Sequence, residues 1–380
     1  MKVLAIQTSF SINSGGGRAD YEILSELAYL GHDVRVVMPH TNRLNVSLPP
    51  GISRDFVYAR GLQFPQSLGM VAFPSVLRIA YQFQPDIIRD HSPYSYGLMS
   101  LLLGKLLSIP VVGMIYHHDE DMPGHKFVEK YLLDRYDHVI TISRYSKNVL
   151  NSLVPSLSDK LDYIYCGVRP SFSSVKRNTL NWRMNLGISE DEPLFLSSGV
   201  LTHRKNHEFL LDVMYLWSQM GRPGKLIITG EGQLLSRLKN KVSVLNLEDR
   251  VFFVGYQTEQ DLVNIMSDSI AFLFPSKMEG FGLAPLEAMS CGTPVIVSDR
   301  GALPEVVTDQ SNGFVLPIDQ GPELWVRAMD MLVNDSGLQE SLVKASEGLR
   351  DKFSWQKSGR ETSDLYKKIV HKHTYSASSL

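Results

Sequence analysis

The chain has 380 residues, of which 43% are hydrophobic and 21% are charged, and its formal net charge at pH 7 is -2. Length alone favours two domains of ordinary size, and the composition excludes an intrinsically disordered protein. Residues 1–168 carry 15 basic and 15 acidic side chains, and the remainder carries 23 basic and 25 acidic ones. Neither half therefore has the excess of basic residues expected of a nucleic-acid-binding domain.

The cysteine count and the apolar runs indicate in which cellular compartment the protein resides. Two cysteines, Cys166 and Cys291, cannot build a disulfide framework, and we expect both to be free thiols packed in the interior of a protein in a reducing environment. The first residues, 1–7, lack the length and cleavage pattern of a secretory signal and predict a buried strand. The longest apolar stretch contains Lys105 and Pro110, which predict a helix and then a strand rather than a membrane span. We therefore expect a cytoplasmic protein.

Short β-branched runs alternate with longer amphipathic segments. This alternation predicts parallel, doubly wound α/β sheets, and the series starts afresh after the Gly- and Pro-containing segment 166–170. We expect one domain at residues 1–168, a second at 169–354, and a ligand in the cleft between them, beyond the carboxyl ends of the strands. The predicted strands are 3–6, 34–38, 87–88, 111–115, 139–142, 194–197, 225–229, 251–254, 270–274 and 294–297, and the predicted helices include 19–30 and 94–107.

The segment from Glu279 to Glu287 carries the clearest chemical signal. A glycine-rich turn, Gly280-Phe281-Gly282, follows an apolar strand and precedes a predicted helix. Backbone N–H groups at the start of such a helix have no partner within the helix and offer a site for phosphate oxygens. The two glutamates cannot bind phosphate, but carboxylates accept hydrogen bonds from hydroxyl groups. Together these groups suggest a ligand with phosphate in its middle and hydroxyls at both ends, such as a nucleotide sugar.

Two other segments follow a predicted strand and precede a predicted helix. The three glycines at 15–17 let the backbone approach a ligand closely, and the helix that follows adds a positive partial charge; an ordinary flexible turn is the alternative. Arg204 and Lys205 would meet a diphosphate, arginine through its planar fork and lysine as a point charge; a solvated basic pair is the alternative.

A segment rich in histidine and acid residues, 117–121, follows the predicted strand 111–115. Three interpretations remain open. Asp119 and Asp121 could bind a divalent metal together with nearby histidines, or the segment could be a solvated acidic loop. We favour the third, in which His117 or His118 lines the site, because imidazole can donate or accept a hydrogen bond there.

The aromatic segment 61–83 also allows three interpretations. With few charges among its aromatic residues, it could line an acceptor groove, rest on a membrane, or form an ordinary core helix, which we favour. The aromatic residues are Phe64, Phe73, Tyr81 and Phe83.

Residues 276–305 closely resemble the signature of the group 1 (family 4) retaining glycosyltransferases, and weaker similarity covers nearly the whole chain. The resemblance implies the GT-B fold, with two Rossmann-like domains facing a central cleft and a C-terminal helix at about 355–372 that returns to the first domain. It places Glu279 beside the hydroxyls of the donor sugar and Glu287 on the ribose hydroxyls.

The same resemblance assigns the remaining contacts. Arg204 and Lys205 would neutralise the phosphates and, with Glu279 and His117 or His118, form the catalytic group. The base would lie near Gly230. The residues expected to bind the donor are Gly16, Gly17, Arg204, Lys205, Gly230, Phe253, Tyr256, Glu279, Gly280, Phe281, Gly282, Leu283, Ala284 and Glu287.

The chain departs from the family pattern at two places. Many members carry arginine directly after the glycine that matches Gly199; Val200 stands there, and Arg204 would substitute for the arginine. Tyr116 stands where the family histidine often falls, and His117 follows one position later.

The function implied by the resemblance is retaining transfer of a hexose from a nucleoside diphosphate sugar to a saccharide or lipid-linked acceptor, in cell-surface or extracellular polysaccharide synthesis. UDP-glucose is the first expectation for the donor and GDP-mannose the next. We expect no metal, no other cofactor and no nucleic-acid partner, and peripheral contact with the inner face of the plasma membrane is compatible with such an acceptor. The alternatives are a GT-B sugar-nucleotide epimerase and a non-catalytic subunit that binds a nucleotide sugar.

Overall fold

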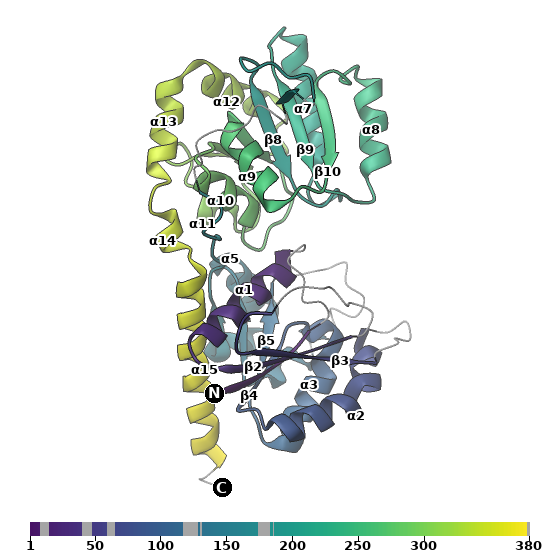
Figure 1. Cartoon of the computed structure of the whole chain (residues 1–380), viewed down its shortest axis with the longest axis vertical. Coiled ribbons are helices and arrows are strands. Elements are labelled where there is room, and N and C mark those ends of the chain that lie inside the picture. Colours follow the sequence, from purple (N-terminus) through teal and green to yellow (C-terminus); the bar gives the residue numbers. More distant parts are fainter. Residues whose placement is uncertain are drawn as a thin grey trace. The chain divides into compact units, whose positions relative to one another are not determined.

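The computed structural model describes residues 1–7, 15–39, 48–58, 65–116, 128–129, 131–173, 183–184 and 186–377. The chain forms two compact units (Figure 1). Unit 1 comprises Met1–Gly167 and Phe353–Leu380, and unit 2 comprises Val168–Lys352. The chain therefore enters unit 2 after Gly167 and returns to unit 1 at Phe353.

A parallel sheet forms the centre of unit 1. Its strand order in the described part of the chain is β3-β2-β1-β4-β5-β6-β7. The chain therefore adds β2 and β3 on one side of β1, then crosses to the other side and adds β4 to β7 there. The strands are β1 (Lys2–Ile6), β2 (Asp33–Pro39), β3 (Ile52–Val57), β4 (Ile87–Asp90), β5 (Val111–Ile115), β6 (His138–Thr141) and β7 (Leu161–Tyr163).

Helices cover both faces of this sheet, as the alternation of side chains along β1 requires. Leu4 and Ile6 belong to a hydrophobic cluster with residues of α2 (Pro65–Phe83) and α3 (Pro93–Leu107). Val3 and Ala5 are equally buried and point to the other face, where α1 (Gly15–Tyr29) packs against α15 (Trp355–Ala377) (Figure 1). The other helices of unit 1 are η2 (Leu133–Arg135), α5 (Arg144–Leu153) and η3 (Pro155–Lys160).

Unit 2 repeats this architecture. Its parallel sheet has the order β10-β9-β8-β11-β12-β13, so the direction of winding reverses between β8 and β11. A second hydrophobic cluster contains Trp217 and Trp325, both fully buried. The strands are β8 (Leu194–Ser198), β9 (Lys225–Thr229), β10 (Val251–Gly255), β11 (Ala271–Phe274), β12 (Val295–Ser298) and β13 (Phe314–Leu316). The helices are α7 (His207–Gln219), α8 (Leu235–Val244), α9 (Glu259–Asp268), α10 (Leu283–Ser290), α11 (Leu303–Val306), α12 (Glu323–Asn334), α13 (Ser336–Ala345) and α14 (Leu349–Lys352).

Every strand predicted from the sequence is present, within two residues at each end, and the parallel α/β class is confirmed. One local prediction is wrong: the described part of the glycine segment, Gly15 to Gly17, is not a turn before a helix but the first turn of α1 itself. Glycine destabilises a helix least in its first turn, where the backbone N–H groups have no hydrogen-bond partner within the helix. The segment 61–83 forms α2 over its described residues, and Ala72, Val76 and Ala80 pack into the core as the core-helix interpretation expects.

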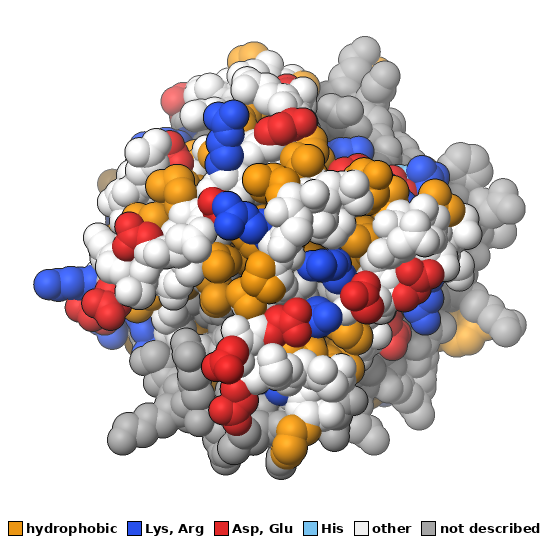
Figure 2. All heavy atoms as spheres, turned by 90° about the horizontal axis from the view of Figure 1, so that it is seen from above, with side chains coloured by type: hydrophobic (Ala, Val, Ile, Leu, Met, Phe, Trp, Pro, Cys, Tyr) orange, Lys and Arg blue, Asp and Glu red, His pale blue; other side chains and the backbone are white. Residues whose placement is uncertain are grey.

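The two cysteines and the surface agree with the composition. Cys166 and Cys291 are free and buried, as predicted. The face seen in Figure 2 carries basic and acidic side chains side by side, with hydrophobic ones between them and no expanse of a single charge. Among the described residues, no helix combines the length and the apolar character needed to cross a membrane.

The contact between α1 and α15 can be tested with one methyl group. A Cβ atom on Gly359 of α15 would lie 2.4 Å from the Cβ atom of Glu26 on α1. Alanine normally stabilises a helix by up to about 1 kcal/mol relative to glycine. Here Gly359→Ala should destabilise the protein by roughly 1–3 kcal/mol in urea unfolding, because the two helices must move apart.

Gly337→Ala is the matched control, because Gly337 is also helical and its nearest neighbour is the side chain of Asp335 at 3.3 Å. This variant should be close to wild type. A Gly359→Ala protein as stable as wild type would show that α15 does not pack on α1 in this way.

Candidate functional site

The best-defined polar cluster of unit 2 lies where its winding reverses. In doubly wound sheets, ligands bind beyond the carboxyl ends of the strands at this point. The segments that leave the two neighbouring strands are 199–206, after β8, and 275–282, after β11. They carry the basic pair and the glutamate that the sequence analysis selected.

The carboxylate of Glu279 joins these two segments. Its Oε1 atom accepts hydrogen bonds from Lys205 Nζ at 2.6 Å, Arg204 Nη1 at 3.0 Å and Ser276 Oγ at 2.6 Å. Arg204 Nη1 also donates to the carbonyl of Met278 at 2.8 Å. Glu279 is 8% exposed, so its carboxylate is largely shielded from water.

Backbone contacts fix the two segments to each other. The amide of Lys277 donates to the carbonyl of Arg204 at 2.8 Å, and Ser276 Oγ lies 3.1 Å from the same carbonyl. Asn206 Nδ2 donates to the carbonyl of Pro275 at 3.2 Å. These bonds place the basic pair before any ligand binds, so little ordering is left to the binding step.

Close backbone approach also shapes the site. Gly301 has a φ of +64°, and a Cβ atom there would lie 2.3 Å from the carbonyl oxygen of Glu279. In the same way, a Cβ atom on Gly230 would lie only 2.2 Å from the carbonyl oxygen of Gly199. Both positions therefore require glycine for steric reasons, independently of any contact with a ligand.

The charges of this cluster depend on one another. Burial alone would raise the pKa of Glu279, but Lys205 and Arg204 reverse the effect and hold this pKa below its ordinary value. Burial lowers the pKa of Lys205, and Glu279 opposes that shift. The stem of Lys205 packs beside Gly199, and its ammonium group lies 4.6 Å from the ring centre of Phe274.

The predicted phosphate-binding turn lies at the start of α10. Gly282 is the N-cap residue, and Leu283 and Ala284 form the first turn of the helix. The amide groups of a first turn have no carbonyl partner within their own helix. Leu283 and Ala284 are half-buried, whereas Gly280, Phe281 and Gly282 are buried.

The other predicted donor contacts lie apart from this cluster. Glu287 is 6% exposed and forms an ion pair with Arg169, with 3.6 Å between Oε1 and Nη2. Phe253 packs against the hydrophobic core of unit 2, and Tyr256, just after β10, is 56% exposed. The sequence assigned no role to Ser276, although it lies in the segment that carries the resemblance.

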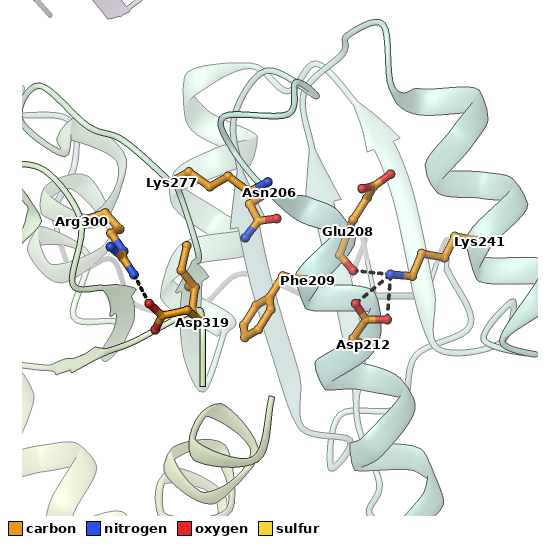
Figure 3. Close-up of a pocket in the computed structure, with 9 residues that line it drawn as sticks. Asn206, Glu208, Phe209, Asp212, Lys241, Lys277, Arg300 and Asp319 are labelled. Atoms are coloured by element: carbon orange, nitrogen blue, oxygen red, sulfur yellow. Dashed lines mark hydrogen bonds and ion pairs between the residues drawn. The ribbon is translucent and has the colours of Figure 1, made fainter. Parts of the chain in front are cut away.

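Unit 2 also contains a hollow beside the segment 199–206, which carries the basic pair. Its volume is about 500 Å³, and Asn206 and Lys277 form part of its wall. Figure 3 shows the ring of Phe209 at its centre, with an Arg300–Asp319 pair to one side and Lys241 bound to Asp212 on the other. Both of these cations have a carboxylate partner, as Arg204 and Lys205 do.

Unit 1 places Gly16 and Gly17 at the start of α1 and brings an unpredicted residue to the same place. His91 follows β4, and its Cε1 atom would lie 3.9 Å from a Cβ atom on Gly16. Its ring contacts that of Tyr116, with 5.0 Å between the ring centres. His117, His118, Asp119 and Asp121 lie outside the described residues. Within the residues that are described, no group of three or more His, Cys, Asp or Glu side chains is arranged to hold a metal.

A buried charge network lies behind His91. Asp20 of α1 is fully buried; its Oδ2 atom contacts His91 Nδ1, and its Oδ1 atom accepts from Arg89 and from the hydroxyl of Tyr116. Burial would raise the pKa of Asp20, but the Arg89 guanidinium holds this pKa well below its usual range. Arg89 also donates to the hydroxyl of Tyr366 on α15 at 2.7 Å, so the network ties α15 to the sheet.

Two family models match complementary parts of the chain. The family described as "Glycosyl transferases group 1" matches residues 178–348, and "Glycosyltransferase Family 4" matches residues 13–172. The chain therefore belongs to the group 1, family 4 glycosyltransferases, enzymes that move a sugar from a nucleotide sugar to an acceptor.

Individual relatives agree with this assignment. An uncharacterized glycosyltransferase of Methanocaldococcus jannaschii is 31% identical over 234 residues, which span 60% of this chain and 59% of the relative. N-acetyl-alpha-D-glucosaminyl L-malate synthase of Bacillus anthracis is 23% identical over 97% of this chain and 98% of its own length. The crystal structure of Anabaena HepE in complex with UDP and glucose has a TM-score of 0.79 at 18% identity and covers 97% of this chain and 100% of that one. The predicted GT-B fold, with two Rossmann-like domains, is confirmed.

The buried histidine next to the basic pair predicts an acid-sensitive unit 2. His207 is 3% exposed, and burial, with the charge of Lys205 in second place, lowers its pKa from 6.5 to about 4. Because the folded state binds fewer protons than the unfolded state between these values, stability falls as the pH drops from 6.5 to 4. The loss should be roughly 3 kcal/mol in urea unfolding, and His207→Asn should remove it.

His203→Asn is the control, because His203 is an exposed histidine of the same segment. It should keep the pH dependence of the wild-type protein. The same loss of stability in His207→Asn would show that other groups cause it.

Proposed function

We propose that the chain is a retaining hexosyltransferase that uses UDP-glucose and needs no metal. The acceptor is a hydroxyl of a saccharide or a lipid-linked saccharide, in the synthesis of cell-surface or extracellular polysaccharide. The single observation that carries the proposal is the convergence of Arg204 and Lys205 on the carboxylate of Glu279 at the point where the winding of unit 2 reverses.

The two cations have capacity left for the diphosphate. Arginine has five N–H donors, and Arg204 uses Nη1 for Glu279 and Met278, so Nε and Nη2 remain. Lysine has three, and the hydrogen bond from Lys205 to Glu279 needs only one. As the bond between the sugar and the diphosphate breaks, negative charge grows on the leaving oxygen. Preorganised cations and the amides at the start of α10 would stabilise this charge, a role in which one donor is worth roughly 10²- to 10³-fold in rate.

Glu279 would face the transferred sugar. Its three hydrogen bonds from side chains fall on Oε1, so Oε2 can accept a sugar hydroxyl. The lowered pKa keeps this carboxylate ionised and able to support positive charge that develops at the anomeric carbon. The proposal takes Glu287 to bind the ribose and the loop after β10 to bind the base, as the family resemblance implies. The glucose and UDP of the Anabaena HepE structure support this choice of donor.

Incubation with UDP-glucose alone separates the proposal from its rivals. A transferase slowly releases UDP with water as the acceptor, whereas an epimerase converts UDP-glucose into an isomeric nucleotide sugar. A non-catalytic subunit binds the donor and leaves it unchanged. Slow UDP release without an isomeric product is expected, and either other result would reject the proposal.

Arg204→Ala tests the role of the basic pair. The side chain of Arg204 is 42% exposed, so its loss should change the stability by less than about 1 kcal/mol. The rate of UDP release from UDP-glucose should fall roughly 10²- to 10³-fold, because a donor to the leaving diphosphate is missing. Lys205→Ala is less informative, since it removes a partner from the buried carboxylate of Glu279 and would also disturb folding.

Lys277→Ala is the matched control for charge. Lys277 is exposed and its amide binds the carbonyl of Arg204, but its side chain lines the other hollow. Its removal should leave the rate within about twofold of wild type, a change that corresponds to less than 0.5 kcal/mol. Equal losses in both variants would indicate a general effect of net charge instead of a specific contact.

A further inference from the structure

His91 lies in unit 1 next to the strand pair at which the winding reverses, as the basic pair does in unit 2. The winding of the unit 1 sheet reverses between β1 and β4, and ligands of such sheets bind beyond the carboxyl ends of these strands. His91 is the residue directly after β4, and Gly16 is the second residue of α1, the helix that follows β1. The His91 side chain is 10% exposed, so it lies under the surface at this edge.

Asp20 fixes the orientation of the imidazole. Contact between His91 Nδ1 and the fully buried Asp20 carboxylate favours the tautomer with the proton on Nδ1. The other ring nitrogen, Nε2, is then a hydrogen-bond acceptor. Asp20 cannot turn away easily, because Arg89 and Tyr116 hold its second oxygen.

The groups around His91 suit an uncharged ligand. Arg89 is fully buried, and its terminal nitrogens are bound to Asp20, Tyr116 and Tyr366, so it is not available to a phosphate. The Arg89–Asp20 ion pair behind the imidazole has no net charge, so it offers an anion no attraction. An imidazole that accepts a hydrogen bond at such an edge matches a hydroxyl group.

Gly16 leaves room for this ligand. A Cβ atom there would lie 3.8 Å from Tyr116 Cγ and 3.9 Å from His91 Cε1, which is ordinary van der Waals contact. The fold itself therefore has space for alanine at position 16. A methyl group at this position would contact the His91 ring.

We propose that His91 binds a sugar hydroxyl through Nε2, and that Asp20 is the positioning residue that orients it. This inference rests on the proposed function, because it takes the substrate to be a sugar. The hydroxyl belongs either to the hexose of the donor or to a saccharide acceptor.

Titration calorimetry with UDP and UDP-glucose, together with NMR of the histidine ring signals with free glucose, tests the inference. If the hydroxyl belongs to the donor, His91→Gln weakens UDP-glucose binding about tenfold and leaves UDP binding unchanged. If it belongs to the acceptor, both affinities stay unchanged and glucose shifts the His91 ring signals. Gly16→Ala should fold normally and reduce the same interaction.

His138→Gln is the matched control. His138 also faces a carboxylate, with 3.1 Å between Nε2 and Asp162 Oδ2, and its side chain is 11% exposed. It begins β6, however, and so lies at the amino ends of the parallel strands, whereas His91 lies at their carboxyl ends. It should behave as wild type in every titration. The inference is overturned if His91→Gln leaves the preference for UDP-glucose over UDP intact and glucose does not shift the ring signals, or if UDP affinity falls as much as UDP-glucose affinity. A wild-type protein that binds neither nucleotide contradicts the proposed function instead, and the glucose titration still decides the role of His91.

Discussion

The site of unit 2 depends on one carboxylate oxygen. Oε1 of Glu279 accepts hydrogen bonds from a lysine, an arginine and a serine, and it joins the segments that follow β8 and β11. A buried carboxylate without these partners would be costly, and so would a buried Lys205 without the carboxylate. Each charge therefore keeps the other in place. The cluster is held ready for a ligand by its own electrostatics, and the steric need for glycine at position 301 keeps the backbone of Glu279 close to the end of β12.

The two units share one sheet topology but carry different kinds of polar groups at it. Both sheets reverse their winding at a pair of adjacent parallel strands, and both carry their polar groups beyond the carboxyl ends of that pair. Unit 2 carries cations and a helix start, which suit phosphate. Unit 1 carries a histidine backed by a buried aspartate, which suits a hydroxyl. The two proposed contacts thus lie at sites of different charge, with phosphate at the cations of unit 2 and a sugar hydroxyl at His91 of unit 1.

Hydrophobic periodicity was sufficient to predict most of the fold, because the central strands are continuous apolar runs. It missed three edge strands of the described sheets, β3 (Ile52–Val57), β7 (Leu161–Tyr163) and β13 (Phe314–Leu316). In β3, Arg54 and Asp55 break the apolar pattern. It also ended β4 too early, since Arg89 and Asp90 continue the strand while fully buried. Arg89 is bound by Asp20, Tyr116 and Tyr366, and Asp90 is bound by Tyr136 as well as by the nearby amide of Ser92. No local pattern reveals the distant partners among these. For this reason the sequence predicted Arg204, Lys205 and Glu279 but not His91.

The central claim is that the diphosphate of a nucleotide lies at the basic pair and the first turn of α10. Amide NMR of the protein titrated with UDP, and separately with uridine, tests it most directly. We expect UDP to shift the amide signals of Leu283, Ala284, Arg204 and Lys205, and uridine to leave them nearly unchanged because it lacks the phosphates. Shifts that appear equally with uridine, or that gather at Lys277 and Arg300 instead, would contradict the account.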